Sequence, residues 1–164
     1  MNKISKKKIY GVVICYNSEN VIKDLYERID KDMFDKIYFF DDNSTDKSYE
    51  IAKKFNWTVF KNEQNLGHGG NLKQAIKTAF ENGADYVLEI HADNQYDPNL
   101  ISKAKKFINE DYALIIGSRF VNKNPHKEEG MPFLRYISNK LMSNMTSQLL
   151  SIDLTEFHTG FKVF

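Results

Sequence analysis

Short runs of hydrophobic residues recur along the chain, and longer segments with hydrophobic residues every three or four positions separate them. The short runs are rich in β-branched and aromatic residues, which is typical of strands buried on both faces. We predict strands at residues 9–15, 36–40, 57–60, 86–90 and 113–116, and a last one within residues 157–164.

The separating segments have the period of amphipathic helices, and most begin with a residue that favours a helix start. The polar stretch 121–131 is predicted to be a loop. The predicted start residues, in chain order, are Ser18, Asn43 or Ser44, Asn71, Asp97 with Pro98, and Pro132.

Strand and helix alternate about five times, which predicts an α/β fold with a mainly parallel, twisted sheet and helices on both faces. We expect a single domain over residues 1–164, with a Rossmann-like arrangement of its strands and helices. In such sheets, ligands bind beyond the carboxyl ends of the strands. The residues that follow each strand are therefore the first candidates for function.

Two neighbouring carboxylates, Asp41 and Asp42, end the second strand. One of them can point into the crevice and accept a hydrogen bond from a ring N–H, such as that of uracil or guanine. The alternative is purely structural, with Asn43 or Ser44 capping the next helix and Asp41 exposed to solvent.

The stretch from Gly67 to Gly70 contains three glycines and leads into a helix. Such a stretch lets the backbone approach a phosphate closely, although a flexible turn explains it equally well. It is neither a dinucleotide fingerprint nor a P-loop, because the third glycine and the Gly-Lys-Ser/Thr element are missing.

The fourth strand runs into His91, Asp93 and Gln95, which alternate along the chain and would share one side of an extended segment. Imidazole, carboxylate and amide groups could form part of an octahedral site for Mg²⁺ or Mn²⁺, completed by a diphosphate and water. The alternative is a polar turn that leads into the next helix.

Composition narrows the class of protein. The 164 residues carry 23 basic and 22 acidic side chains, for a net charge of +1, which gives no electrostatic signature of a dedicated nucleic-acid binder. The single cysteine cannot form an internal disulfide. No long apolar stretch follows the charged residues 1–8, so we expect no signal peptide, and no apolar run approaches the roughly 20 residues of a membrane span. We therefore expect a soluble, cytoplasmic protein.

Taken together, these motifs resemble those of the family 2 glycosyltransferases, which have the GT-A fold. The matching segments are ICYNSE, FFDDNSTD, NLGHGG, HADNQYDP, GSRF and EFHTGFK, and they cover nearly the whole chain. The most similar branch is that of the dolichyl-phosphate-mannose synthases. The resemblance implies nucleotide contacts from Asn17, Glu19 and Asp42, with a metal and the diphosphate at Asp93. It also implies that Arg119 lies near the donor sugar or phosphates.

Tyr16 and Gly67 each follow the end of a predicted strand, so we expect them to line the same crevice. The sequence also departs from the family pattern. His91 stands where the metal motif usually begins with Asp, and Lys162 replaces an arginine. Family members continue well beyond Phe164, so we expect part of the C-terminal region to be missing.

The resemblance implies an inverting transfer of a sugar from a nucleoside-diphosphate sugar to a polyprenyl phosphate or a glycan hydroxyl. A hydroxyl acceptor needs a general base, for which Glu156 and Asp153 are candidates, whereas a phosphate acceptor needs none. A lipid acceptor would bring the protein to the inner face of the membrane, and residues 132–150 could lie on that surface. The alternative, which the hydrophobic pattern of this segment favours, is an ordinary core helix. Two alternatives are a sugar nucleotidyltransferase and a non-catalytic nucleotide-binding remnant or partner subunit.

Overall fold

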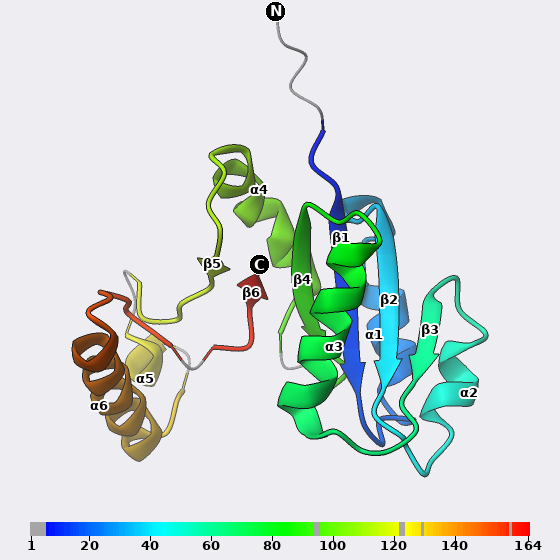
Figure 1. Cartoon of the computed structure of the whole chain (residues 1–164). Coiled ribbons are helices and arrows are strands. Elements are labelled where there is room, and N and C mark those ends of the chain that lie inside the picture. Colours follow the sequence, from blue (N-terminus) through cyan, green and yellow to red (C-terminus); the bar gives the residue numbers. More distant parts are fainter. Residues whose placement is uncertain (1–5, 94–95, 122–123, 129, 158) are drawn as a thin grey trace, which may run out of the picture. The chain divides into compact units, whose positions relative to one another are not determined.

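The computed structural model describes residues 6–93, 96–121, 124–128, 130–157 and 159–164 (Figure 1). By its internal contacts the chain divides into two compact units. The first comprises residues 1–115 together with Val163 and Phe164, and the second comprises residues 116–162.

The sheet is mainly parallel, as the alternation of strands and helices predicts. Its order is β3-β2-β1-β4-β6-β5, with β1 parallel to β2 and β4, β2 parallel to β3, and β4 antiparallel to β6. The strands are β1 (Ile9–Cys15), β2 (Lys36–Asp41), β3 (Thr58–Lys61), β4 (Tyr86–His91), β5 (Ile115–Ile116) and β6 (Lys162–Val163). Strands β2 and β3 lie on one side of β1, and the next strand in the chain, β4, lies on the other side. This reversal lies between β1 and β4, and it is where α/β sheets bind ligands.

Helix α3 (Gly67–Glu81) covers one face of the first unit's sheet (Figure 1). It buries Ala75 and Ala79 against side chains such as Val12, Phe40 and Val87, which alternate onto that face. The remaining helices of this unit are α1 (Ile22–Arg28), η1 (Lys31–Met33), α2 (Ser48–Ala52), η2 (Pro98–Leu100) and α4 (Ile101–Asn109).

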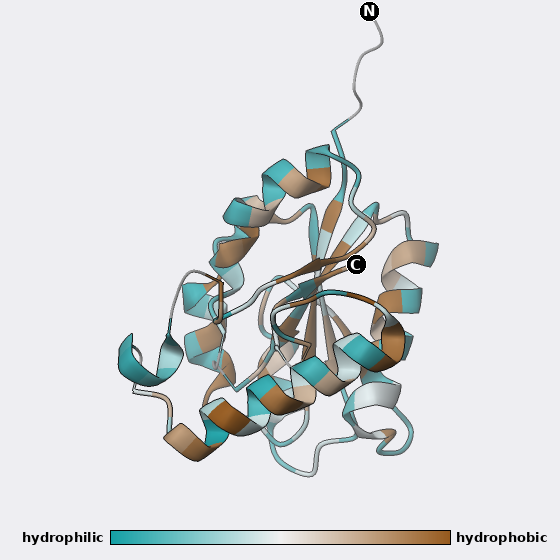
Figure 2. Cartoon of the chain, turned by 90° about the vertical axis from the view of Figure 1, so that its left-hand side faces the viewer, coloured by the Kyte–Doolittle hydropathy of each residue, from teal (hydrophilic) through white to brown (hydrophobic). Residues whose placement is uncertain are grey.

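The opposite face is packed with aromatic rings. Tyr26 of α1 stacks on Phe55 at 4.0 Å between ring centroids, and Phe39 of β2 stacks on Trp57 at 5.7 Å. Phe39 and Phe40 are both completely buried and point to opposite faces because they are adjacent in a strand. Hydrophobic residues dominate the central strands, whereas the helices carry both hydrophobic and hydrophilic residues along their length (Figure 2).

The second unit contains α5 (Pro125–Glu128) and α6 (Phe133–Leu150). Helix α6 begins directly after Pro132, as predicted. Its predicted apolar stripe is not covered, because Leu134 is 78% and Leu149 is 85% exposed. Among the helices that the structure describes, none combines the length and hydrophobicity needed to cross a bilayer.

Several predicted element boundaries were wrong. Helix α3 begins at Gly67, four residues before Asn71, which lies buried inside the helix. Within the stretch 121–131, which was predicted to be a loop, Pro125–Glu128 form the short helix α5. Of the predicted last strand, residues 157–164, the described residues form only the two-residue β6, and β5 is also only two residues long.

The predicted helix caps at Ser18 and at Asn43 or Ser44 were also wrong. The backbone carbonyl of Ser18, and not its hydroxyl, accepts the N–H of Ile22. At α2, Oδ1 of Asp46 accepts the N–H of Ser48 at 2.9 Å. Asp97 was predicted correctly, since its carboxylate accepts the N–H of Asn99 at the start of η2.

Candidate functional site

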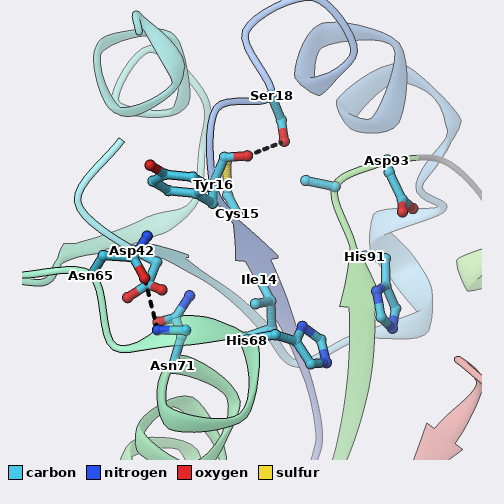
Figure 3. Close-up of a pocket in the computed structure, with 12 residues that line it drawn as sticks. Ile14, Cys15, Tyr16, Ser18, Asp42, Asn65, His68, Asn71, His91 and Asp93 are labelled. Carbon is cyan, nitrogen blue, oxygen red and sulfur yellow. Dashed lines mark hydrogen bonds between the residues drawn. The ribbon is translucent and has the colours of Figure 1, made fainter. Parts of the chain in front are cut away.

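A pocket of about 420 Å³ opens at the carboxyl ends of β1, β2 and β4 (Figure 3). This volume falls within the range of small-molecule sites. Predicted site residues that line it are Tyr16 after β1, Asp42 after β2, Gly67 at the start of α3, and His91 and Asp93 at the end of β4. The pocket therefore lies at the carboxyl ends of the strands, beside the reversal of strand order.

The carboxylate of Asp42, directly after β2, lines the pocket. It is 3% exposed, and its Oδ1 accepts hydrogen bonds from the backbone N–H of Leu66 and from Nδ2 of Asn62, both at 2.8 Å. Asn62 also donates to Oδ1 of Asn71, and Asn71 donates to the carbonyl of Phe40. This buried network fixes the orientation of the Asp42 carboxylate in the pocket wall.

The side chain of Asp41 stabilises the loop after β2. The sequence left open whether this side chain is exposed to solvent, but it is completely buried. Its Oδ2 accepts the backbone N–H of Ser44 at 3.0 Å and lies 3.9 Å from Nζ of Lys61. Only the second carboxylate of the pair thus faces the pocket.

Reciprocal hydrogen bonds clamp the loop after β1 to the loop after β2. Oδ1 of Asn17 accepts the N–H of Thr45, and Oε2 of Glu19 accepts the N–H of Lys47, each at 2.9 Å. In return, Oδ2 of Asp46 accepts the N–H of Glu19 at 3.0 Å. The described lining of the pocket includes neither Asn17 nor Glu19, so their predicted contacts with a nucleotide stay predictions.

Cys15 ends β1 and lines the pocket floor, but it is only 1% exposed. Burial raises the pKa of its thiol to about 11, against weaker lowering by hydrogen bonds with Ser18 and Ser48. The thiol is therefore protonated at neutral pH and serves as a small packing group.

The start of α3 forms another wall of the pocket. Oδ1 of Asn65 accepts the N–H of Gly67 at 2.9 Å, and the backbone of Gly67 has a φ of +72°, which favours glycine. His68 in this first turn also lines the pocket. The sequence pattern indicates only a glycine-rich turn here, so His68 was missed as a site residue.

The end of β4 supplies three polar side chains. Glu89 and His91 point to the face that α3 covers, and Nε2 of His91 lies 3.2 Å from Oε1 of the completely buried Glu89 carboxylate. Nε2 of His68 lies 3.2 Å from the same oxygen. Asp93 follows at the pocket edge, and Gln95, the third predicted metal ligand, lies outside the described residues. Glu89 was not predicted, because a glutamate inside an apolar run gives no positional signal.

Two further predicted residues, Arg119 and Glu156, belong to the second unit and pair with each other. The Glu156 carboxylate accepts the backbone N–H of Arg119 at 2.8 Å and its Nε at 3.1 Å, and Nη2 of Arg119 forms a further charged contact. Glu156 is 1% exposed, so this arginine supplies the positive charge that a buried carboxylate needs. The roles predicted for the two residues in donor binding and base catalysis stay predictions.

The sequence matches known proteins along nearly its whole length. The model of the family described as "Glycosyl transferase family 2" matches residues 11–164. The chain belongs to this family. A relative from Methanococcus voltae, described as a UDP-N-acetylglucosamine--dolichyl-phosphate N-acetylglucosaminyltransferase, is 30% identical over 98% of the chain and 70% of its own length. A dolichol-phosphate mannosyltransferase from Pyrococcus furiosus is 28% identical over 81% of the chain and 38% of its own length.

Solved structures confirm the GT-A fold of this family 2 chain. Glucosyl-3-phosphoglycerate synthase from Mycobacterium tuberculosis, in complex with Mn²⁺, uridine diphosphate and phosphoglyceric acid, superposes with a TM-score of 0.68 over 96% of the chain at 17% identity. The chain spans 55% of that protein, 70% of the Methanococcus voltae relative and 38% of the Pyrococcus furiosus one.

Proposed function

We propose that this chain binds a uridine-diphosphate sugar and transfers the sugar, with inversion, to the phosphate of a polyprenyl lipid. The observation that carries the proposal is the pocket at the reversal of strand order, which brings Asp42 and Asp93 to one opening. A relative that covers 98% of the chain is described as using a UDP-sugar and dolichyl phosphate, which supports the choice of donor and acceptor.

Asp42 is the residue that we assign to the base. Both of its hydrogen bonds, with Asn62 and Leu66, use Oδ1, so we assign Oδ2 to accept the ring N–H of uracil. The carboxylate is held rigidly by these two residues, so it loses little conformational entropy when a base binds. Tyr16, which is half exposed beside it, offers a ring on which the base can stack.

Asp93 is the residue that we assign to the diphosphate, through a divalent ion. Its carboxylate is a hard oxygen donor at the pocket edge, the type of ligand that Mg²⁺ and Mn²⁺ take in proteins, so the residues present fit such an ion. When bound, the ion neutralises charge that develops on the leaving diphosphate. The first turn of α3 presents backbone N–H groups to the same pocket and favours negative charge there.

Of the other two predicted ligands of this ion, Gln95 lies outside the described residues. The other is His91, whose Nε2 lies beside Glu89. We therefore keep Asp93 alone as the assigned ligand of the diphosphate ion.

The proposed acceptor agrees with the arrangement of Glu156. A phosphate monoester is already an anion near neutral pH, so attack on the sugar needs no general base. The Glu156 carboxylate accepts N–H groups of Arg119 at both of its oxygens, so both oxygens are already engaged in the pairing. We infer that Glu156 positions Arg119 in the second unit, and that Arg119 remains a candidate for contact with donor or acceptor phosphate.

The test is turnover on a panel of nucleotide sugars with polyprenyl phosphate, measured as nucleoside diphosphate released. We expect release of uridine diphosphate that depends on the lipid phosphate. Release only from guanosine-diphosphate sugars would overturn the donor assignment. Binding of a nucleotide sugar without turnover would instead favour the non-catalytic alternative.

A further inference from the structure

Three side chains of the first unit converge at one edge of the pocket: His68 from the first turn of α3, and Glu89 and His91 from β4. Glu89 and His91 are two positions apart in a strand, so they share the face that α3 covers. Figure 3 shows the imidazoles of His68 and His91 beside one another, with ring centroids 5.2 Å apart and planes inclined by 19°. One ligand atom from each of the three residues lies within 4.8 Å of the others.

The buried carboxylate of Glu89 defines the chemistry of this cluster. Its side chain is 0% exposed, while those of His91 and His68 are 22% and 56% exposed. Carboxylate oxygens and imidazole nitrogens are both common ligands of Zn²⁺ in proteins. The Nε2 atoms of His68 and His91 both lie near Oε1 of Glu89, an arrangement in which the three side chains could coordinate one cation.

Two of the three distances between ligand atoms agree with a coordination sphere, and the third is within 4.8 Å. In a tetrahedral site with metal–ligand bonds of about 2.0–2.1 Å, neighbouring ligand atoms lie about 3.3 Å apart. Both Nε2 atoms lie 3.2 Å from Oε1 of Glu89. A metal ion could therefore enter between the three atoms with only a small movement of the side chains.

We propose that His68, Glu89 and His91 form a binding site for a transition-metal ion of the Zn²⁺ type, separate from the ion assigned to Asp93. Two imidazoles and one carboxylate suit Zn²⁺ and neighbouring transition metals, whereas Mg²⁺ prefers an all-oxygen shell. Three protein ligands leave one coordination position open. His68 and His91 both line the pocket, so that position is open to a ligand in the pocket.

The direct test is titration of metal-stripped protein, without a polyhistidine tag and without nucleotide, with Zn²⁺, Mn²⁺ and Mg²⁺. We expect one Zn²⁺ per chain, weaker binding of Mn²⁺ and no measurable binding of Mg²⁺. His68→Asn should weaken Zn²⁺ binding by about 100-fold or more, because it removes one of three ligands. Its side chain is more than half exposed, so this change leaves the fold intact. Glu89→Gln tests the second ligand, with its melting temperature as a check on folding.

Two control variants show whether Zn²⁺ binding is specific to these three residues. His126→Asn removes a histidine whose Nδ1 contacts the carbonyl of Met131 in the second unit, and it should leave Zn²⁺ binding unchanged. Asp93→Asn should also leave it unchanged, because the proposed site does not include Asp93. Substitution with Co²⁺ should give the intense visible absorption of a tetrahedral site, and His68→Asn should abolish it.

The proposal is overturned if His68→Asn binds Zn²⁺ as tightly as the parent protein, or if His126→Asn or Asp93→Asn weakens binding as much as His68→Asn does. The outcome is independent of the proposed function, because no nucleotide is present. Failure to bind uridine diphosphate would count against the proposed function and leave the metal site in place.

Discussion

At the scale of single residues, some polar side chains near the pocket stabilise the surrounding loops, whereas others face the pocket. Asp41 and Asp42 are adjacent and chemically identical. Asp41 interacts with the N–H of Ser44 and with Lys61, whereas Asp42 lines the pocket. The residue pattern alone could not decide between them, because the choice depends on the pleat of β2 at its last residue and on where the chain turns. The family resemblance did select Asp42.

Asp42 provides the first prediction. Asp42→Asn should weaken the binding of uridine diphosphate by about tenfold or more, since it removes a charged hydrogen-bond acceptor and can present an N–H to the ring N–H of uracil. Calorimetry measures this affinity. Glu63→Gln, which removes an exposed carboxylate two residues after β3, is the matched control and should bind normally. Equal affinity for the Asp42 variant and this control would end the assignment of the base to Asp42.

Cys15 provides a second prediction at this scale. The raised pKa of about 11 means that the thiol carries almost no thiolate at pH 8, and burial also blocks access. Alkylation of the native protein by iodoacetamide at pH 8 should therefore be very slow, and it should become rapid in urea. Mass spectrometry follows the reaction. Rapid modification of the folded protein would show that the pocket floor is open.

At the scale of elements, strands β1 to β4 were predictable, whereas the starts of α1, α2 and α3 were not. The buried run of β1 matches the prediction residue for residue, because a strand buried on both faces is hydrophobic at every position. The start of α3 was missed because Gly67 and Gly70 lower helix propensity, while packing of the helix against the sheet outweighs that cost. Glu89 shows a further limit, since a buried carboxylate depends on partners from another element.

The clamp between the loops after β1 and β2 depends on Asp46. Burial alone would raise the pKa of Asp46, but hydrogen bonds from the hydroxyl and N–H of Ser48 and from the N–H of Glu19 lower it below 3.8. Asp46→Ala should reduce the free energy of unfolding by about 1 kcal/mol, similar to the loss of a helix cap. Urea denaturation measures this, with the exposed Glu27→Ala on α1 as the control.

The pH dependence of the Asp46 contribution follows from the sign of the shift. A carboxyl group with a lowered folded-state pKa stabilises the protein above its ordinary value of 3.8, and this stabilisation is lost as the pH falls through the folded-state pKa. The difference between the parent protein and Asp46→Ala should therefore be constant near neutral pH and shrink in acid. A difference that grows in acid would contradict this role.

At the scale of the whole molecule, the candidate functional residues lie in both units. The first unit holds the pocket, with Asp42 and Asp93, and the second holds Arg119 and Glu156. The order of motifs along the sequence could predict the family and the fold, but it could not show that Arg119 and Glu156 contact each other. That contact joins residues 37 positions apart in the chain.

The pairing gives a prediction about the acceptor. Glu156→Gln should lower the free energy of unfolding by about 1–3 kcal/mol, because it removes a charged partner of Arg119. With polyprenyl phosphate, turnover should fall by less than about tenfold, whereas the loss of a general base costs about 100-fold or more. Asp153→Asn, the other candidate base, is the exposed control for both measurements. A loss of 100-fold with Glu156→Gln at unchanged donor affinity would instead assign the base to Glu156.

The central claim, that the pocket at the reversal of strand order binds the donor nucleotide through Asp93 and a divalent ion, is tested most directly by calorimetric titration with uridine diphosphate and Mn²⁺. The account predicts one site per chain, with binding strengthened by Mn²⁺ and weakened by about tenfold or more in Asp93→Asn, since one charged ligand is lost. Glu110→Gln, an exposed carboxylate after α4, should behave as the parent. Affinity that is the same in Asp93→Asn and the parent, or that does not respond to Mn²⁺, would contradict the account.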